Sequence, residues 1–572
     1  MLNLEFLLPL LLFGGVSAKN KNPPNTAALP CDPSIFTPPV VPGATVISIT
    51  AESKRNHSTP FIPPFYDAIT NLHFCYVSVR LNHPGANDNV LVEVWLPVTR
   101  DGWNGRFQAT GGGGFATGLL SLALAPALKD GYAVSSTDGG HTEGYFDLDW
   151  AVTHDAERGS YTVNYDLLQN WATRSLADQV YVGKSITEQY FKEKPHHSYW
   201  NGCSTGGRQG YMMAQRYPGL LDGILAVAPA IGATSVAMGS LWPQVLMIES
   251  GTFLSNCEFG WFTKKAIEKC DLLDGVRDGV IIDPEACDFD PSAFVGEKFH
   301  CDGQEIQVTQ TMAEIVHKTW EGPKTAFGTS IYPGLPHGTS AEGIADIDIS
   351  PEGVRSPNPF AVASAHVKSL LLRDPSFNIS KLTYESYFAL WAQAEHQYAW
   401  LLDTDSTDLS GLKNAGTKLL SWHGINDEII SYENTIHYRQ RVEIEMGGAK
   451  SVDEYYRLFL APGVKHCKGG LGPAPHRAME QLEDWVEKGE APETLDARTT
   501  DTEGDLVTRE LCRWPRKLKY MGIGDANRAS SWACEGEETF EDFSSENTNR
   551  AGEILGGLKE RLIGLGLGLN IN

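Results

Sequence analysis

The chain has 572 residues, enough to bury a large core in roughly one to three domains. Its 42% hydrophobic residues are ordinary for a globular protein. The formal net charge of −25 at pH 7 argues against nucleic acid or an anionic membrane surface as a partner, because both repel an acidic protein.

The N-terminus has the pattern of a secretory signal peptide over residues 1–18. Phe6–Phe13 is an apolar run too short to span a bilayer, and Val16–Ala18 offers small residues for cleavage. A buried N-terminal helix is the alternative. No other stretch is long and apolar enough to cross a membrane, so the sequence predicts a secreted, extracellular protein.

Secretion permits disulfides and N-glycans. The cysteines are even in number and none has zinc-site spacing. They are Cys31, Cys75, Cys203, Cys257, Cys270, Cys287, Cys301, Cys467, Cys512 and Cys534. Asn56 and Asn378 stand in Asn-x-Ser sequons and predict a glycoprotein, although a chain of this length carries such sequons by chance.

Strands and helices alternate after an extended Pro-rich arm at 19–45, which a Cys31–Cys75 disulfide would tie down. The patterns predict strands at Phe74–Leu81, Val90–Leu96, Tyr132–Ser135, Ser198–Trp200 and Leu221–Ala228, and helices at Leu119–Leu128, Tyr165–Tyr190 and Arg208–Tyr217. Such alternation is typical of an α/β sheet that is largely parallel.

The alternation stops between about residues 240 and 414, where the chain is helical, loop-rich and cysteine-bearing. It resumes with strands at Lys418–Trp422 and Arg457–Leu460 and a helix at Ala478–Lys488. We expect a catalytic domain at 19–239 and 415–534, an inserted lid domain at 240–414, and a poorly ordered tail at 535–572.

A nucleophile elbow is predicted at Gly202-Cys203-Ser204-Thr205-Gly206. The Gly-x-Ser-x-Gly pattern lies between a predicted strand and a predicted helix, where such a turn exposes a serine hydroxyl above the sheet. Small flanking residues suit the strained backbone and the close packing there. The pattern alone is common by chance, and its setting strengthens the prediction.

Asp427 and His466 follow later strands in the order that a Ser-Asp-His triad of the α/β-hydrolase fold requires. An imidazole must take the proton of a serine hydroxyl, and a carboxylate must orient that imidazole. A helix N-cap is the alternative for Asp427, and a solvated loop position for His466. Three partners in the right order favour the triad. His141 and His423 are predicted to be structural.

Cys203 precedes the serine and Cys467 follows the histidine. If Ser204 and His466 are in contact, these two cysteines can approach within disulfide distance and tie the nucleophile to the base. Free or otherwise paired cysteines are the alternative.

Together these motifs resemble the fungal tannase and feruloyl esterase family. The resemblance also covers Trp103–Phe107, the glycine run Gly111–Gly114 and an acidic loop. It implies an α/β-hydrolase fold with a large inserted lid domain, Ser204 as nucleophile, His466 as base, Asp427 as its orienting carboxylate, and a Cys203–Cys467 disulfide.

An oxyanion hole should combine the N–H of Thr205 with one from Gly112 or Gly113, because glycines let the backbone approach a ligand closely. A glycine turn shaped only for packing is the alternative.

The acidic loop Cys270–Asp283 offers oxygen ligands. Calcium could be bound by the carboxylates of Asp271, Asp274 and Asp278 and by the backbone carbonyls of Val276 and Val280. The spacing is not that of an EF-hand. From the residues alone, an acidic turn without metal is as plausible. The resemblance implies a structural Ca²⁺ there, in the lid, and no organic cofactor. Cys270–Cys287, Cys257–Cys301 and Cys512–Cys534 are plausible remaining pairs.

We expect a secreted serine carboxylesterase that hydrolyses phenolic acid esters through an acyl-enzyme. The resemblance implies feruloyl esters of plant cell-wall polysaccharides, or alternatively gallate esters, the substrates of a tannase. Thr205 and Gln209 are similar to the feruloyl esterases, and the cysteine pattern is similar to the tannases. A non-catalytic binding protein would have lost a triad residue, and nothing in the sequence favours a serine peptidase.

Overall fold

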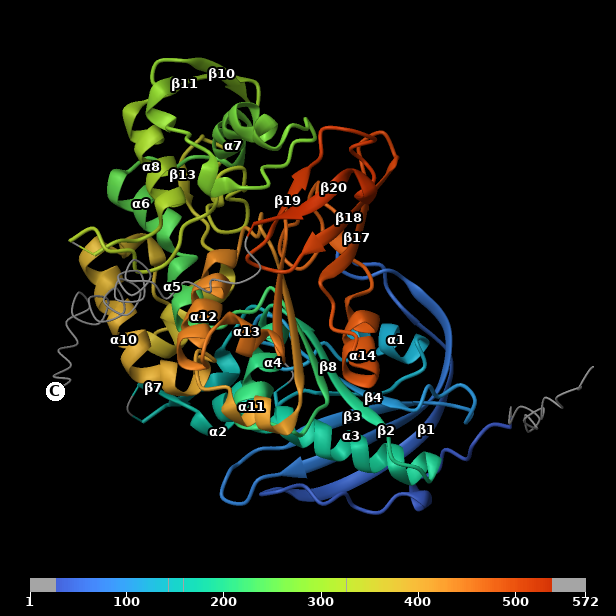
Figure 1. Cartoon of the computed structure of the whole chain (residues 1–572). Coiled ribbons are helices and arrows are strands. Elements are labelled where there is room, and N and C mark those ends of the chain that lie inside the picture. Colours follow the sequence, from blue (N-terminus) through green and yellow to red (C-terminus); the bar gives the residue numbers. More distant parts are fainter. Residues whose placement is uncertain (1–26, 142–143, 158, 326, 537–572) are drawn as a thin grey trace, which may run out of the picture.

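A sheet of nine strands forms the centre of the computed structural model, which describes residues 27–141, 144–157, 159–325 and 327–536 (Figure 1). The expected signal peptide lies outside the described residues, as does the expected tail beyond residue 536. The strand order is β1-β2-β3-β5-β4-β8-β9-β14-β15. The bounds are β1 (Thr45–Thr59), β2 (Ile69–Asn82), β3 (Val90–Pro97), β4 (Arg106–Thr110), β5 (Ala133–Thr137), β8 (His197–Cys203), β9 (Gly223–Val227), β14 (Lys418–Gly424) and β15 (Tyr456–Ala461).

The sheet is antiparallel from β1 to β5 and parallel from β5 through β4 to β15. The parallel strands therefore end at one edge, where loops carry functional groups in open α/β sheets. This is the α/β-hydrolase fold that the sequence predicted.

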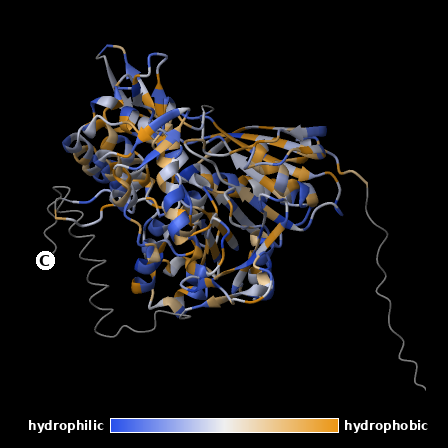
Figure 2. Ribbon diagram, turned by 90° about the horizontal axis from the view of Figure 1, so that it is seen from above, coloured by the Kyte–Doolittle hydropathy of each residue, from blue (hydrophilic) through white to orange (hydrophobic). Residues whose placement is uncertain are grey.

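Helices cover both faces of this sheet. On one face lie α1 (Ser121–Lys129) and α14 (Ala478–Lys488), whose Leu124 and Leu482 share a core with Tyr199 of β8. On the other lie α3 (Ser175–Phe191), α4 (Thr205–Arg216) and α12 (Tyr432–Glu445), which pack on Phe107 and Trp200. Apolar residues gather on the strands and on the helix faces turned towards them (Figure 2).

The segment between β9 and β14 forms a helical lid. Its apolar core includes Trp242, Phe262 and Trp391 and is shared with Trp150 and Trp171, which precede β8. The elements of the lid are α5 (Ala233–Gly239), α6 (Trp242–Ser250), α7 (Asn256–Cys270), β10 (Lys298–Cys301), β11 (Gln304–Gln307), α8 (Gln310–Glu321), β12 (Ile347–Ile349), β13 (Arg355–Pro357), α9 (Ala361–Ala365), α10 (Tyr384–Leu402) and α11 (Ser410–Ala415). In Figure 1 its helices α6, α7 and α8 stand above the carboxyl ends of the parallel strands, whereas α10 and α11 lie lower, beside the sheet.

Three predicted elements differ in the structure. The helix expected at Tyr165–Tyr190 is divided into α2 (Tyr165–Gln169), a π-helical turn at Asn170–Arg174, and α3. At that turn the Asn170 amide donates to Asp88 (2.8 Å). Helix α4 begins at Thr205 rather than Arg208, and the strand expected at Phe74–Leu81 is longer, running from Ile69 to Asn82. Strands β1 and β4 were not predicted.

The C-terminal part of the described chain contains small sheets that the sequence patterns did not predict. They comprise β16 (Ala474–Pro475), β17 (Thr494–Thr500), β18 (Leu506–Cys512), β19 (Lys517–Tyr520) and β20 (Trp532–Glu535). The remaining elements are β6 (Val152–Asp155), β7 (Ser160–Val163) and α13 (Ala449–Asp453). Within the described ranges, no helix is both long and apolar enough to cross a membrane.

All ten cysteines are paired. The disulfides are Cys31–Cys75, Cys203–Cys467, Cys257–Cys301, Cys270–Cys287 and Cys512–Cys534, the pairs that the sequence analysis considered. Cys203–Cys467 spans 264 residues and joins the elbow to the loop after β15.

Candidate active site

Ser204 lies in a strained turn between β8 and α4. Its φ of +63° is in the left-handed region, which a non-glycine residue rarely adopts. The flanking glycines are needed for space: a Cβ on Gly202 would lie 2.5 Å from the Gly206 carbonyl oxygen, and one on Gly207 would lie 2.4 Å from the Val227 oxygen. The local geometry is therefore that of a nucleophile elbow.

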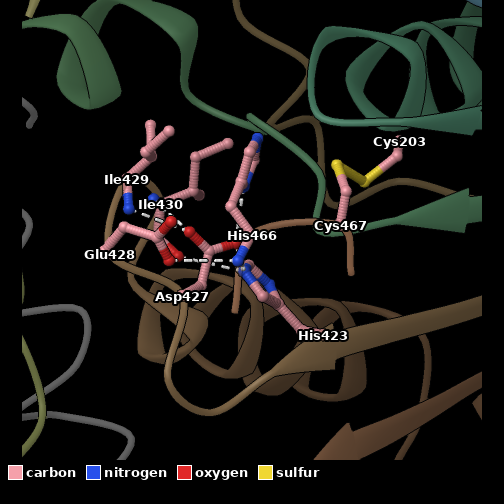
Figure 3. The surroundings of a disulfide bond; sticks show 8 residues. All are labelled: Cys203, His423, Asp427, Glu428, Ile429, Ile430, His466 and Cys467. Atoms are coloured by element: carbon pink, nitrogen blue, oxygen red, sulfur yellow. Dashed lines mark hydrogen bonds and ion pairs between the residues drawn. A yellow bond between two sulfur atoms is a disulfide. The ribbon is translucent and has the colours of Figure 1, made fainter. Parts of the chain in front are cut away.

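Asp427 and His466 form a buried pair beyond the ends of β14 and β15 (Figure 3). Asp427 Oδ2 lies 2.7 Å from His466 Nδ1, so that nitrogen donates its proton and Nε2 is left as an acceptor. The other carboxylate oxygen, Oδ1, accepts the backbone N–H groups of Ile429 (2.9 Å) and Ile430 (2.8 Å). Asp427 thus both organises its own turn and orients His466.

His423 is a third member of this group. Its Nε2 lies 3.2 Å from Asp427 Oδ2 and 3.0 Å from the Ile430 oxygen, and its Nδ1 lies 2.9 Å from the Thr435 hydroxyl. Because both partners of Nε2 are acceptors, Nε2 carries the proton and donates to Asp427. The structural role expected of His423 is a specific one, to hold the carboxylate.

The electrostatics of the pair favour charge separation. Burial acts to raise the pKa of Asp427, but the charge of His466 and the hydrogen bonds from both histidines outweigh it and hold that pKa well below its usual range. Burial acts to lower the pKa of His466, and the Asp427 carboxylate overcomes this, so the pKa of His466 lies above that of an ordinary histidine. A proton taken up by His466 is therefore stabilised.

The serine and the histidine face one cavity. Ser204 and His466 both line a cavity of about 1190 Å³, and the Cys203–Cys467 disulfide joins their neighbours (Figure 3). Among the described residues no hydrogen bond joins the Ser204 hydroxyl to His466. Such contacts are often long without substrate and tighten when it binds.

The backbone donors near Ser204 differ from the expectation. The Gly112 N–H donates to Gln209 Oε1 (2.9 Å), and the Gly113 N–H donates to the Ala116 oxygen (3.2 Å). In this structure neither is free for an oxyanion, so this part of the expectation is not supported. The glycine run serves close packing instead, since a Cβ on Gly111 would lie 2.5 Å from the Cα of Gly206.

The Thr205 N–H remains as a donor beside the serine. Thr205 is the first residue of α4, where backbone N–H groups have no partner within the helix, and no acceptor among the described residues pairs with it. Its hydroxyl donates to the Gly114 oxygen (2.7 Å), which fixes the residue against the glycine run.

Aromatic side chains line the lid side of the cavity: Phe115, Tyr145, Phe146, Trp171 and Phe360. Two buried nitrogens among the lining residues, Trp171 Nε1 and His366 Nε2, have no hydrogen-bond partner in the described part of the chain. Burial lowers the pKa of His366 to about 4, so its ring is neutral at pH 7. This part of the cavity combines aromatic walls with polar atoms that lack partners.

The acidic loop has an unsatisfied oxygen suited to a cation. Asp271 Oδ1 accepts the N–H of Gly279 (3.0 Å) and Asp274 Oδ1 that of Val276 (2.8 Å), whereas Asp274 Oδ2 is buried without a partner. Burial, with the nearby carboxylates of Asp278 and Asp271, raises the pKa of Asp274 to about 6. A divalent cation would relieve this repulsion, so the residues fit the expected Ca²⁺ site.

A different cluster brings potential metal ligands closer together. Among the described residues, one group of three has ligand atoms that all lie within 4.8 Å of one another: His196, His197 and Glu487. The three aspartates of the acidic loop do not form such a group. Arg106 already binds both oxygens of Glu487 (2.6 and 2.9 Å), and its positive charge opposes a cation there.

Comparisons with known proteins give matches over most of the chain. The sequence model of the family "Tannase and feruloyl esterase" matches residues 75–535. A "Probable feruloyl esterase" of Arthroderma benhamiae is 45% identical over 508 residues, covering 88% of this chain and 93% of the relative. "Feruloyl esterase B" of Aspergillus niger is 29% identical, covering 81% and 87%.

Two solved structures are similar over most of the chain. The tannin acyl hydrolase from Aspergillus niger has a TM-score of 0.79 at 25% identity and covers 89% of this chain and 97% of its own. Feruloyl esterase B from Aspergillus oryzae has a TM-score of 0.70 at 25% identity and covers 87% and 97%.

Proposed function

This chain belongs to the tannase and feruloyl esterase family of carboxylic ester hydrolases, and from that premise we propose that it hydrolyses phenolic acid esters with a Ser204-His466-Asp427 triad. The observation that carries the proposal is the serine in a left-handed elbow, in one cavity with a buried Asp–His pair and tied to it by a disulfide.

The proposed reaction has two stages. His466 Nε2 takes the proton of the Ser204 hydroxyl, and the oxygen attacks the ester carbonyl. His466 then donates that proton to the departing alcohol, which leaves the acyl group on Ser204; water, activated by the same nitrogen, releases the acid. In this proposal the Thr205 N–H stabilises the oxyanion, and Asp427, 2.7 Å from His466 Nδ1, stabilises the charged imidazole.

We propose feruloyl esters of plant cell-wall polysaccharides as the substrates. The 45% identical relative named as a probable feruloyl esterase supports this, and the aromatic lid side of the cavity suits a phenolic acyl group. Gallate esters are the second candidate, because the solved tannin acyl hydrolase has the higher TM-score of the two structures. Both acids are phenols, so Trp171 Nε1 or His366 Nε2 can bond a ring hydroxyl of either.

We also propose that the protein is secreted and that Ca²⁺ stabilises the Cys270–Asp283 loop. Five disulfides suit an oxidising compartment, and both sequon asparagines, Asn56 and Asn378, are exposed. Asp271, Asp274 and Asp278, with the carbonyls of Val276 and Val280, would hold the ion, which would neutralise their charge.

The test is to measure initial rates on methyl ferulate, methyl caffeate and methyl gallate, with Ser204→Ala as the control. We expect cinnamate turnover and a loss of roughly 10⁴- to 10⁶-fold in kcat for Ser204→Ala with an unchanged melting curve. Turnover of gallate alone would instead establish the tannase activity. Retained activity in Ser204→Ala would refute the nucleophile.

A further inference from the structure

The cavity at Ser204 continues away from the lid, between helices α1 and α14. Its lining includes Ala123 and Pro126 of α1, Met479 of α14, and Gln108 and Asn201 of the underlying strands. We call this part the α1–α14 arm. It runs along β4 from Thr110, beside the elbow, to Arg106. At the usual rise per residue of a strand, its length is about 13 Å.

The volume of the cavity indicates more than one occupant group. About 1190 Å³ exceeds the range of about 300–1,000 Å³ that commonly holds one drug-sized ligand. An aromatic acyl group on the lid side would leave the α1–α14 arm open, on the other side of the glycine run.

The floor of the arm carries polar groups without partners. Gln108 is only 3% exposed, yet its side-chain amide forms no hydrogen bond with any described residue. The neighbouring Asn201 side chain, on β8, forms none either. Gln108 is buried and Asn201 half-buried, and neither amide is among the polar atoms enclosed without a partner, so both amides are accessible from the cavity. Amides in this position are available to a ligand that accepts and donates hydrogen bonds.

Charged groups of both signs surround the far end. The charged residues that line it are Arg106, Lys129, Asp130, Glu480 and Glu483. Lys129, Asp130 and Glu480 are exposed, so this end opens to solvent. Arg106 lies 3.7 Å from Glu483. With apolar walls, a polar floor and a charged opening, the arm suits a molecule with apolar faces and many hydroxyls.

We propose that the α1–α14 arm is a carbohydrate subsite that binds the sugar portion of the ester's alcohol, with Gln108 and Asn201 bonding its hydroxyls. This inference rests on the proposed function and extends it by naming the residues that recognise the leaving group. An alkyl chain would leave the Gln108 amide unpaired, and a strongly anionic ligand would meet Glu480, Glu483 and Asp130.

The experiment uses an acid whose methyl ester the wild-type protein hydrolyses. It compares two esters of that acid, the methyl ester and an oligosaccharide ester. Ala123→Phe fills the arm from α1. We expect kcat/KM for the oligosaccharide ester to fall at least about tenfold, through KM, while that for the methyl ester changes less than about twofold. Ala415→Phe, at an exposed alanine outside the cavity, is the matched control and should change neither.

A second variant tests the amide itself at nearly constant volume. Gln108→Leu should raise KM for the oligosaccharide ester about three- to tenfold and leave the methyl ester unaffected. The subsite proposal would be overturned if both variants lowered kcat/KM equally for the two esters, or if neither variant lowered it for either ester. If the wild-type protein hydrolysed none of the methyl esters, the proposed function itself would be refuted. Failure of the subsite proposal and failure of the proposed function are therefore distinguishable.

Discussion

At the scale of single residues, the charge on Asp427 governs what His466 can do. The carboxylate receives four hydrogen bonds, from His466, His423, Ile429 and Ile430, and has no exposed surface. It therefore stays ionised and keeps the imidazole in the tautomer whose Nε2 can accept a proton.

This arrangement predicts the pH dependence of the reaction. As a base, His466 must be neutral, so kcat/KM should fall as the pH is lowered through a pKa above that of an ordinary histidine, because Asp427 raises it. Asp427→Asn removes that charge, so we expect the acid limb to move to lower pH and kcat to fall about 10⁴-fold. Stopped or continuous rate assays between pH 4 and pH 9 (roughly 2.5 units on either side of the pKa of an ordinary histidine) would measure both.

Glu428→Gln is the matched control for that prediction. The neighbouring carboxylate accepts the backbone N–H of His466 (3.1 Å) rather than the ring, so its loss should move the acid limb less. An acid limb at the same pH in wild type and Asp427→Asn would contradict the proposed pair.

At the scale of elements, the Cys203–Cys467 disulfide connects two parts of the chain that each supply one reactive group. Ser204 stands at the start of α4, and His466 stands in the loop after β15. Their relative position depends on two separate loops, and both Ser204 and Cys467 have positive φ. The covalent link holds these strained turns together.

Removing this link should affect both stability and turnover. For Cys203→Ala with Cys467→Ala we expect the free energy of unfolding to fall by about 2–5 kcal/mol and kcat to fall as well, because the serine and histidine lose their fixed spacing. Denaturant unfolding and steady-state rates would measure these effects.

The Cys31–Cys75 disulfide provides the comparison, since it ties the N-terminal arm to β2, far from the elbow in sequence and fold. Replacing that pair by alanines should lower stability with little effect on kcat. Equal effects of the two double variants on kcat would show that the Cys203–Cys467 link has no specific role in positioning.

At the scale of the whole molecule, the acidic loop lies between the lid and the C-terminal sheets. It follows α7 of the lid, the Cys270–Cys287 disulfide closes it, and Asp278 lies 3.5 Å from Arg509 of β18. A cation here would stabilise the contact between the lid and the C-terminal sheets, which both lie above the central sheet in Figure 1.

Chelation should therefore lower the melting temperature. A site occupied at 100 times its Kd adds about 2.7 kcal/mol to the free energy of unfolding, which in a protein of this size corresponds to about 2–3 degrees. Differential scanning calorimetry with Ca²⁺ and with a chelator would measure the shift. Asp274→Asn should melt at the same temperature in both; an identical melting temperature for wild type in both buffers would contradict the calcium proposal.

The sequence by itself determined seven of the nine strands of the central sheet and the candidates for the reaction, but not strands β1 and β4 or the order of the strands in the sheet. Buried β-branched runs, amphipathic spacing and the Gly-x-Ser-x-Gly turn are local signals, so helix α14 at Ala478–Lys488 and the elbow at Ser204 were predicted closely. The hairpins β17–β18 and β19–β20 were missed although Leu495, Ala497 and Leu518 alternate with polar residues, because strands of four to seven residues give a weak signal.

Only the tertiary structure decided which polar groups near Ser204 are free. Gln209 occupies the Gly112 N–H from 97 residues away, His466 meets Asp427 from 39 residues away, and Gln108 is left without a partner beneath α1 and α14. Hydrogen bonds and cavities form between segments that are distant in the chain, so composition, periodicity and spacing do not encode them in any one stretch.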